Sequence, residues 1–210
     1  MAVKVIAFTK PVDNEFGHNL SEFIAYVARI SNPGNQWNHD TAQKLLNYLK
    51  THKHFSPFEM ADIVLEIETT RDIARQLLRH RSFSFQEFSQ RYAKVENFSK
   101  PKDARLQDEK NRQASIEFDD ENIKSWWIAV QDTLLESIEH YYDKALQYGI
   151  AKEVARIILP EGLTKSRLYM KGSIRSWIHY LEVRLDESTQ KEHRELAQEI
   201  SDAIESVLHD

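Results

Sequence analysis

Three segments of the chain carry the apolar patterns that are typical of strands. Residues 3–8 are short, apolar and rich in β-branched side chains. Residues 61–69 alternate isoleucine and leucine with acidic residues, which predicts a strand with one solvated face. Residues 163–171 predict a third strand. The second of these strands leads directly into residues 71–79, where three arginines lie at helical spacing.

Helical spacing of apolar residues covers most of the remaining chain. It predicts helices over residues 19–30, around 45–49, and over 123–148, 151–160, 173–184 and 196–207. A stripe on the longest helix is expected to pack in the core or against another subunit: Trp127, Val130, Leu134, Ile138, Tyr141 and Ala145. Pro57 favours extended backbone at Ser56, so residues 54–60 are expected to form a fixed loop. Residues 95–122 are polar and predict a surface excursion with a short helix near 105–115.

Length and composition place the chain among ordinary globular proteins. Its 210 residues can bury a substantial core, and we expect residues 1–210 to form a single domain. The absence of cysteine excludes disulfides and a thiol nucleophile. The first residues lack the apolar core of a signal peptide, and no apolar run approaches the length of a membrane span. We therefore expect a cytoplasmic protein without a membrane partner.

The densest candidate chemistry lies in residues 79–92, where arginine, histidine, glutamate and serine are interleaved with aromatic residues. Guanidinium groups bind phosphate and carboxylate, and aromatic faces stack on bases or flavin rings. Upstream, Arg71, Arg75 and Arg79 share one helical face, where like charges repel. Either acidic counter-ions or a bound polyanion must offset this repulsion. The candidate counter-ions are Asp72, Glu87 and Glu96.

Charge and missing motifs narrow the classes of function. A net charge of −5 disfavours a general nucleic-acid-binding surface and favours a small anionic substrate in a local basic pocket. The chain has no Gly-x-Gly-x-x-Gly and no Walker loop, and its histidines lack metal-binding spacing, so we expect neither a Rossmann turn nor a metal site. Ser89 has no Ser-His-Asp partner order, which disfavours a serine hydrolase.

The sequence Arg79-His80-Arg81, followed after seven residues by Ser89, resembles the signature of the flavin-dependent thymidylate synthases. The match extends to Glu87, Arg91 and Tyr92 within this stretch, and to Gln76 three residues upstream of it. The resemblance extends to residues 28–31, 54–60, 153–160 and 175–190. Three positions depart from the family pattern: Met60, Ser173 and Ser188 stand where His, Asn and His are common.

The resemblance implies an α/β fold of the α+β type, with a central, mostly antiparallel sheet flanked by long helices. It implies a homotetramer whose active sites are shared between subunits. The implied reaction is reductive methylation of dUMP at C5 to dTMP, with 5,10-methylenetetrahydrofolate as carbon donor and FAD carrying hydride from NADPH. The lack of cysteine also excludes the unrelated, cysteine-dependent route to thymidylate.

The same resemblance assigns site residues. Those implied for dUMP are Gln76, Glu87, Ser89, Arg91, Arg156 and Arg184. Those implied for FAD are His54, Ser56, Glu59, Arg79, His80, Arg81, Glu87, Arg175 and His179. The candidate catalytic residues are Arg184, which would polarise the uracil ring, and Ser89, which would bind substrate because nothing nearby activates it as a nucleophile.

A different class of function stays open from the residues alone. An arginine- and aromatic-rich helix could bind nucleotides or single-stranded nucleic acid without catalysis. The acidic net charge and the absence of a broad basic stretch count against this alternative.

Overall fold

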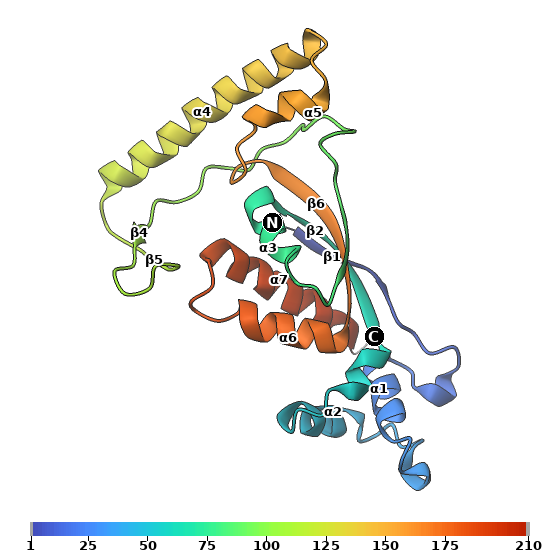
Figure 1. Ribbon diagram of the computed structural model, residues 1–210. Helices are drawn as coiled ribbons and strands as arrows, with labels where there is room; N and C mark the ends of the chain where they lie inside the picture. Colours follow the sequence, from blue (N-terminus) through green and yellow to red (C-terminus); the bar gives the residue numbers. More distant parts are fainter. Residues whose placement is uncertain (1, 209–210) are drawn as a thin grey trace.

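A four-stranded antiparallel sheet organises the fold (Figure 1). The structure, a computed structural model, describes residues 2–208. The strands lie in the order β1 (Ala2–Phe8), β2 (Asp62–Thr70), β6 (Lys165–Ser173) and β3 (Ser84–Glu87). The three strands expected from the sequence are confirmed, as is the mainly antiparallel sheet flanked by helices. Strand β3 was not predicted.

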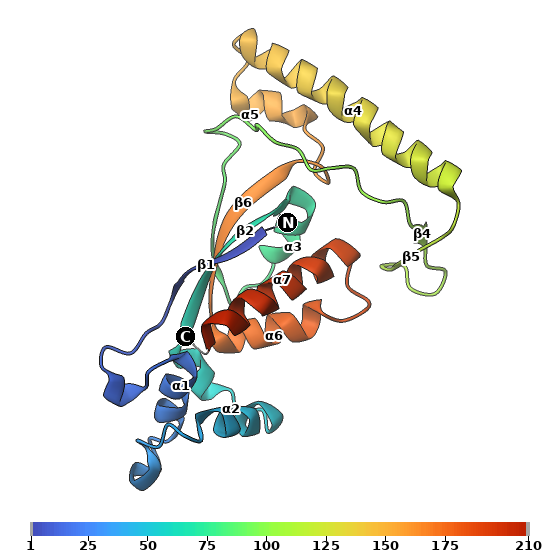
Figure 2. The ribbon, with the colours of Figure 1, turned by 180° about the vertical axis from the view of Figure 1, so that it is seen from behind.

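One face of the sheet forms the core. Ile63, Leu65 and Ile67 on β2 are fully buried, as are Leu168 and Met170 on β6, so the alternation in the sequence correctly identifies the buried face. Helices cover this face from one side in both views (Figures 1 and 2). The covering helices are α3 (Arg71–Leu77), α6 (Ile174–Arg184) and α7 (Lys191–Leu208).

The remaining helices lie near the two ends of the sheet. Helices α1 (Leu20–Ala28) and α2 (Ala42–Thr51) lie near the end where β6 finishes. Helices α4 (Glu121–Gln147) and α5 (Lys152–Ala155) lie near the end where β6 begins (Figure 1). Over residues 2–208 the chain also forms four 3₁₀ helices: η1 (Asn14–Phe16), η2 (Pro33–Asn35), η3 (Ser56–Met60) and η4 (Arg156–Ile158).

Three local expectations were wrong. Residues 54–60 contain the 3₁₀ helix η3, because a proline near a helix start costs no backbone hydrogen bond. Helix α3 ends at Leu77, so Arg79 does not extend the helical row of arginines. The helix expected near 105–115 is a hairpin of β4 (Leu106–Gln107) and β5 (Ser115–Ile116).

The hairpin is favoured because a side chain binds backbone N–H groups that a continuing helix would use for its own hydrogen bonds. The Asp108 carboxylate accepts hydrogen bonds from the backbone N–H groups of Lys110 and Asn111, at 2.7 and 2.9 Å. Such local capping by aspartate favours a turn over a continuing helix.

The aromatic stripe on α4 is not core. Trp127, Leu134 and Tyr141 are 38%, 55% and 61% exposed, and the buried side of the helix carries Leu135 and Tyr142 instead. The other expected role, an interface with another subunit, stays a prediction. Within residues 2–208, none of the helices combines the length and apolar character needed to cross a membrane.

We predict that Gly172→Ala destabilises the fold through Phe83. A methyl group at Gly172 would overlap ring carbons Cδ1 and Cε1 of Phe83, whose ring packs at 4.6 Å, centroid to centroid, on Trp177. We expect the free energy of unfolding, measured with urea, to fall by about 1–3 kcal/mol, because overpacking displaces buried side chains. Gly34→Ala is the control, since nothing lies within 4 Å of the added methyl group. Equal effects of the two substitutions would contradict the prediction.

Candidate active site

The sequence Arg79-His80-Arg81 forms the turn between α3 and β3. The His80 backbone N–H donates to the Leu77 carbonyl at 2.9 Å, and the Phe83 N–H donates to the His80 carbonyl at 3.3 Å. Phe83 is buried in the core, whereas Arg79 and Arg81 are exposed. The turn therefore holds two guanidinium groups in solvent on an anchored backbone, an arrangement suited to a phosphorylated ligand.

His80 and Arg184 join this turn to the end of α6. The Arg184 Nε–H donates to His80 Nε2 at 3.0 Å, which requires an unprotonated Nε2. Burial, the charge of Arg184 and the neighbouring His179 lower the pKa of His80 to about 4. Among residues 2–208, no acceptor pairs with the terminal nitrogens of Arg184. The guanidinium can therefore donate to a ligand at this point.

Gln76 lies in the same region. Its amide oxygen accepts from His193 Nδ1 at 3.0 Å, and its amide nitrogen donates to Gln190 at 2.8 Å. Burial and the charges of Arg184 and His80 lower the pKa of His193 to about 3. The Tyr180 ring lies 5.1 Å from the His80 ring and 5.9 Å from the His193 ring, centroid to centroid, so His193 lies near the His80–Arg184 pair. The structure thus brings Gln76 and His80, from the end of α3 and the turn after it, together with Arg184 of α6 and His193 of α7.

An open pocket of about 380 Å³ lies at the start of α6. Arg175 and Glu59 form an ion pair of 2.9 Å there, and the Ser173 hydroxyl donates to the other Glu59 oxygen at 2.7 Å. The pocket is lined by Phe55, Glu59, Ser82, Arg175, Ser176, Ile178, His179 and Glu182. Three residues expected at the flavin therefore share one pocket: Glu59, Arg175 and His179.

His54 and Ser56 are exposed and do not line this pocket. The His54 ring lies 6.2 Å from the Tyr48 ring, centroid to centroid. Both residues immediately flank Phe55, which does line the pocket. They lie next to the pocket in the chain rather than within it.

Another group of expected residues lies near the beginning of β6. Arg91 Nε lies 3.3 Å from Glu153 on α5, and the Arg91 backbone N–H donates to Ser89 Oγ at 3.4 Å. Arg156 begins the 3₁₀ helix that follows α5. Ser89, Arg91 and Arg156 therefore form a second group, with cationic and hydroxyl groups suited to a phosphate.

The counter-ion interpretation of the arginine row is confirmed in one case. Arg71 lies 3.5 Å from Glu87, which also accepts a hydrogen bond from Ser166 at 2.8 Å. Arg75 pairs instead with Glu161. Asp72 pairs with Lys102 at 3.0 Å rather than with an arginine, so that expected pairing was wrong.

Strand β6 separates the group of Ser89, Arg91 and Arg156 from the pocket lined by Glu59, Arg175 and His179. Its nine residues, Lys165–Ser173, span about 26 Å at roughly 3.3 Å per residue. Arg156 precedes the strand and Arg175 follows it, and α5 and α6 lie near its opposite ends (Figure 1). A single chain therefore does not place Arg156 beside Arg175.

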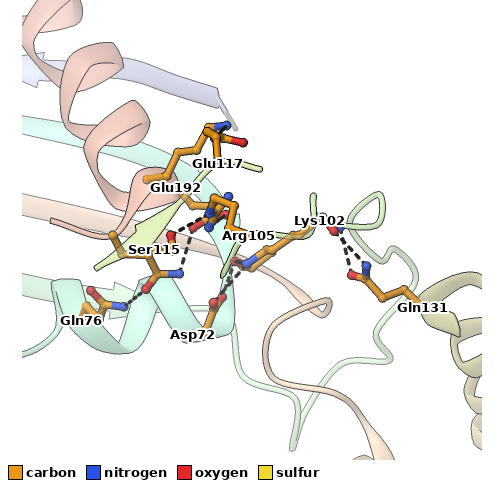
Figure 3. Close-up of polar contacts among 11 residues, drawn as sticks. Asp72, Gln76, Lys102, Arg105, Ser115, Glu117, Gln131 and Glu192 are labelled. Atoms are coloured by element: carbon orange, nitrogen blue, oxygen red, sulfur yellow. Dashed lines mark hydrogen bonds and ion pairs between the residues drawn. The ribbon is translucent and has the colours of Figure 1, made fainter. Parts of the chain in front are cut away.

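The sequence did not reveal a polar cluster around Gln76, formed with Arg105, Gln190, Glu192 and His193. Figure 3 shows Arg105 reaching from the excursion to Glu192, at 2.6 Å, and to Ser115, at 2.9 Å. Glu192 and His193 precede the helix expected over 196–207, and the sequence assigned them no role. The available signal was their helical spacing from Leu196 and Ala197, which puts both residues on the apolar face of α7 but does not identify their partners. Over the described part of the chain, no group of three or more His, Asp or Glu residues is arranged to hold a metal ion.

The sequence is similar to a family of known proteins over most of its length. Residues 16–208 match the sequence model of the family described as thymidylate synthase complementing protein. A probable flavin-dependent thymidylate synthase from Paramecium bursaria Chlorella virus 1 is 52% identical over 197 residues, covering 94% of this chain and 90% of that protein. A flavin-dependent thymidylate synthase from Synechocystis sp. is 52% identical over 199 residues, covering 94% and 91%.

Comparison with known structures supports the same fold. The crystal structure of a UMP/dUMP methylase, PolB, from Streptomyces cacaoi, bound with 5-Br UMP, aligns with a TM-score of 0.80 at 23% identity. The alignment covers 98% of this chain and 89% of that chain.

We predict that His80 makes stability depend on pH between about 6.5 and 4. An unfolded histidine binds a proton near pH 6.5, whereas folded His80, with its pKa at about 4, does not. The free energy of unfolding is therefore unaffected by protonation of His80 above pH 6.5. It falls as the pH is lowered from 6.5 towards 4, by up to about 1.4 kcal/mol per pH unit, because protonation favours the unfolded chain.

Urea unfolding of His80→Gln should show a smaller loss between pH 6.5 and 5 than the wild type. Glutamine still offers an acceptor to Arg184 but does not titrate. His140→Gln, at an exposed position on α4, is the control and should keep the wild-type slope. An unchanged slope in His80→Gln would contradict the assigned protonation state.

Proposed function

We propose that this chain, which belongs to the family of flavin-dependent thymidylate synthases, converts dUMP to dTMP by reductive methylation at C5. The observation that carries the proposal is the Arg184–His80 hydrogen bond of 3.0 Å within the family motif. It fixes a guanidinium whose terminal nitrogens remain available to the uracil ring. Family membership also favours catalysis over the non-catalytic nucleic-acid-binding alternative.

The chain's own residues fit a flavin, and we propose FAD as its form. Arg175 in the pocket, with the exposed Arg79 and Arg81, would supply cations for the diphosphate, and His80 would supply a ring nitrogen. Further contacts are proposed for His54, Ser56, Glu59, Glu87 and His179. Bound flavin supplies hydride transfer, with NADPH as the proposed reductant and 5,10-methylenetetrahydrofolate as the proposed carbon donor.

The substrate roles follow from charge and position. Arg91 and Arg156, with Ser89 and its backbone, would hold the phosphate of dUMP. Arg184 would donate to a uracil carbonyl and stabilise the electron density that builds on the ring during attack. Contacts to the nucleotide are also proposed for Gln76 and Glu87. None of these roles requires Ser89 to act as a nucleophile.

The separation of the expected site residues within one chain supports an assembly of several chains. The Arg156 group lies near the beginning of β6, whereas the pocket of Glu59 and Arg175 lies at its end, so a site that uses both needs two chains. We propose that the dUMP site joins Ser89, Arg91 and Arg156 of one chain to Gln76, His80 and Arg184 of another. The exposed aromatic stripe of α4 offers apolar surface for such contacts. We propose a homotetramer of single-domain chains with shared active sites.

A mixing experiment tests both the chemistry and the sharing. Arg184→Ala and Arg156→Ala should each abolish tritium release from C5-labelled dUMP, because each removes one group's cation. When the two variants are co-expressed in equal amounts and assemble at random, about a quarter of the shared sites carry both arginines, since each half is intact in half of the chains. We therefore expect about a quarter of the wild-type activity to return.

Arg184→Ala mixed with Gln76→Ala is the matched control. Both residues belong to the same group, so no mixed site is intact, and activity should not exceed the mean of the two separate variants. If Arg184→Ala and Arg156→Ala assemble normally but do not complement each other, the shared site is refuted. If either variant alone keeps wild-type turnover, that residue has no part in the reaction.

A further inference from the structure

A chain of hydrogen bonds runs from the core, through Gln76, to the excursion between β3 and α4. It starts at Tyr180, whose hydroxyl lies 3.1 Å from His193 Nε2. His193 Nδ1 meets the Gln76 oxygen at 3.0 Å, and the Gln76 nitrogen donates to Gln190 at 2.8 Å. The Gln190 nitrogen donates to Glu192 at 3.0 Å, where the chain ends.

The carboxylate of Glu192 sets the direction of every bond in this chain. A carboxylate can only accept, so Gln190 must present its nitrogen to Glu192 and its oxygen to Gln76. Gln76 must then present its nitrogen to Gln190 and its oxygen to His193. His193 must carry its proton on Nδ1, which leaves Nε2 to accept from Tyr180.

Arg105 keeps Glu192 ionised. The two side chains are 14% and 10% exposed, and their ion pair is 2.6 Å long. The bonds from Arg105 and Gln190 lower the pKa of Glu192 against the opposing effect of burial. Arg105 lies at the start of the β4–β5 hairpin, so the excursion is bound to the site rather than merely covering the surface (Figure 3).

We propose that Glu192 and His193 are positioning residues that hold the Gln76 amide in one orientation, with its second N–H ready to donate to dUMP. This inference rests on the proposed function, which places Gln76 at the nucleotide. With the amide reversed, Gln76 would offer dUMP a carbonyl oxygen in place of that N–H. An acceptor facing a uracil carbonyl loses a hydrogen bond and adds repulsion.

The substitution Glu192→Gln separates positioning from simple packing. The new side chain offers its oxygen to Arg105 and therefore its nitrogen to Gln190. Gln190 and Gln76 can then both reverse, and His193 can move its proton to Nε2, with every hydrogen bond of the chain kept. The variant should fold, yet it should present the wrong Gln76 atom to the nucleotide.

The experiment measures two properties of Glu192→Gln. Nitrogen-15 NMR of histidine-labelled protein should report the Nδ1–H tautomer of His193 in the wild type and the Nε2–H tautomer in the variant. Calorimetry should show a roughly tenfold weaker Kd for dUMP, the loss expected for one hydrogen bond. Glu195→Gln, at an exposed position on the same helix, should change neither property.

An unchanged tautomer or an unchanged Kd in Glu192→Gln overturns the proposal. Failure of the wild type itself to bind dUMP would refute the proposed function instead, and the tautomer measurement would still test the fixed orientation. If Glu192→Gln does not fold, a second pair of variants tests the same proposal through dUMP affinity. His193→Asn keeps a donor near the position of Nδ1 and should retain dUMP affinity, whereas His193→Gln lacks it and should not.

Discussion

The antiparallel ladder between β2 and β6 is the constraint on which the arrangement of the site depends. All nine residues of each strand are paired, from Asp62 with Ser173 to Thr70 with Lys165. At one end of this ladder the chain enters α3 directly from β2, and at the other end it enters α6 directly from β6. The ladder therefore fixes where both charged helices start, and loops do not have to position them.

The length of the β2–β6 ladder also keeps two kinds of candidate site residue apart. Residues suited to a phosphate collect near the beginning of β6, while the pocket of Glu59 and Arg175 lies at its end. In the proposed assembly, a site that needs both kinds of residue is completed by another copy of the chain. This division explains how an acidic protein can offer strongly basic sites: its cations are concentrated in a few places, and many of its other charges are paired locally.

Neutral histidines are the second feature of the site. Placed beside Arg184, a protonated His80 or His193 would add repulsion in a partly buried region. Their low pKa values keep them as uncharged donors and acceptors that orient Arg184 and Gln76. The fixed tautomers are a consequence of hydrogen-bond geometry and not of the sequence near either residue.

Sequence patterns predicted the features that depend on local periodicity. The alternation around Ile63, Leu65 and Ile67 gave the buried face of β2. The helix expected over 123–148 ends in the structure at Gln147, two residues before Gly149 with its positive φ of 79°. Strand β3 could not be found in this way. Its four residues, Ser-Phe-Gln-Glu, are mostly polar and form a strand because the edge of β6 is available to pair with them.

The partners of the residues in the polar cluster around Gln76 could not be predicted from the sequence. Arg105 and Glu192 are 87 positions apart, and Gln76 and His193 are 117 apart. No period or spacing rule relates such residues, because tertiary packing brings them together. The resemblance to the family identified Gln76 and Arg184 as candidates, but only the structure shows which residues orient them.

The visible absorption spectrum of the purified protein, recorded before and after addition of dUMP, tests the central claim most directly. The account predicts a flavin spectrum that shifts when dUMP binds, because the nucleotide and the flavin would occupy adjoining parts of one site. A colourless protein that neither takes up added FAD nor responds to dUMP would contradict it.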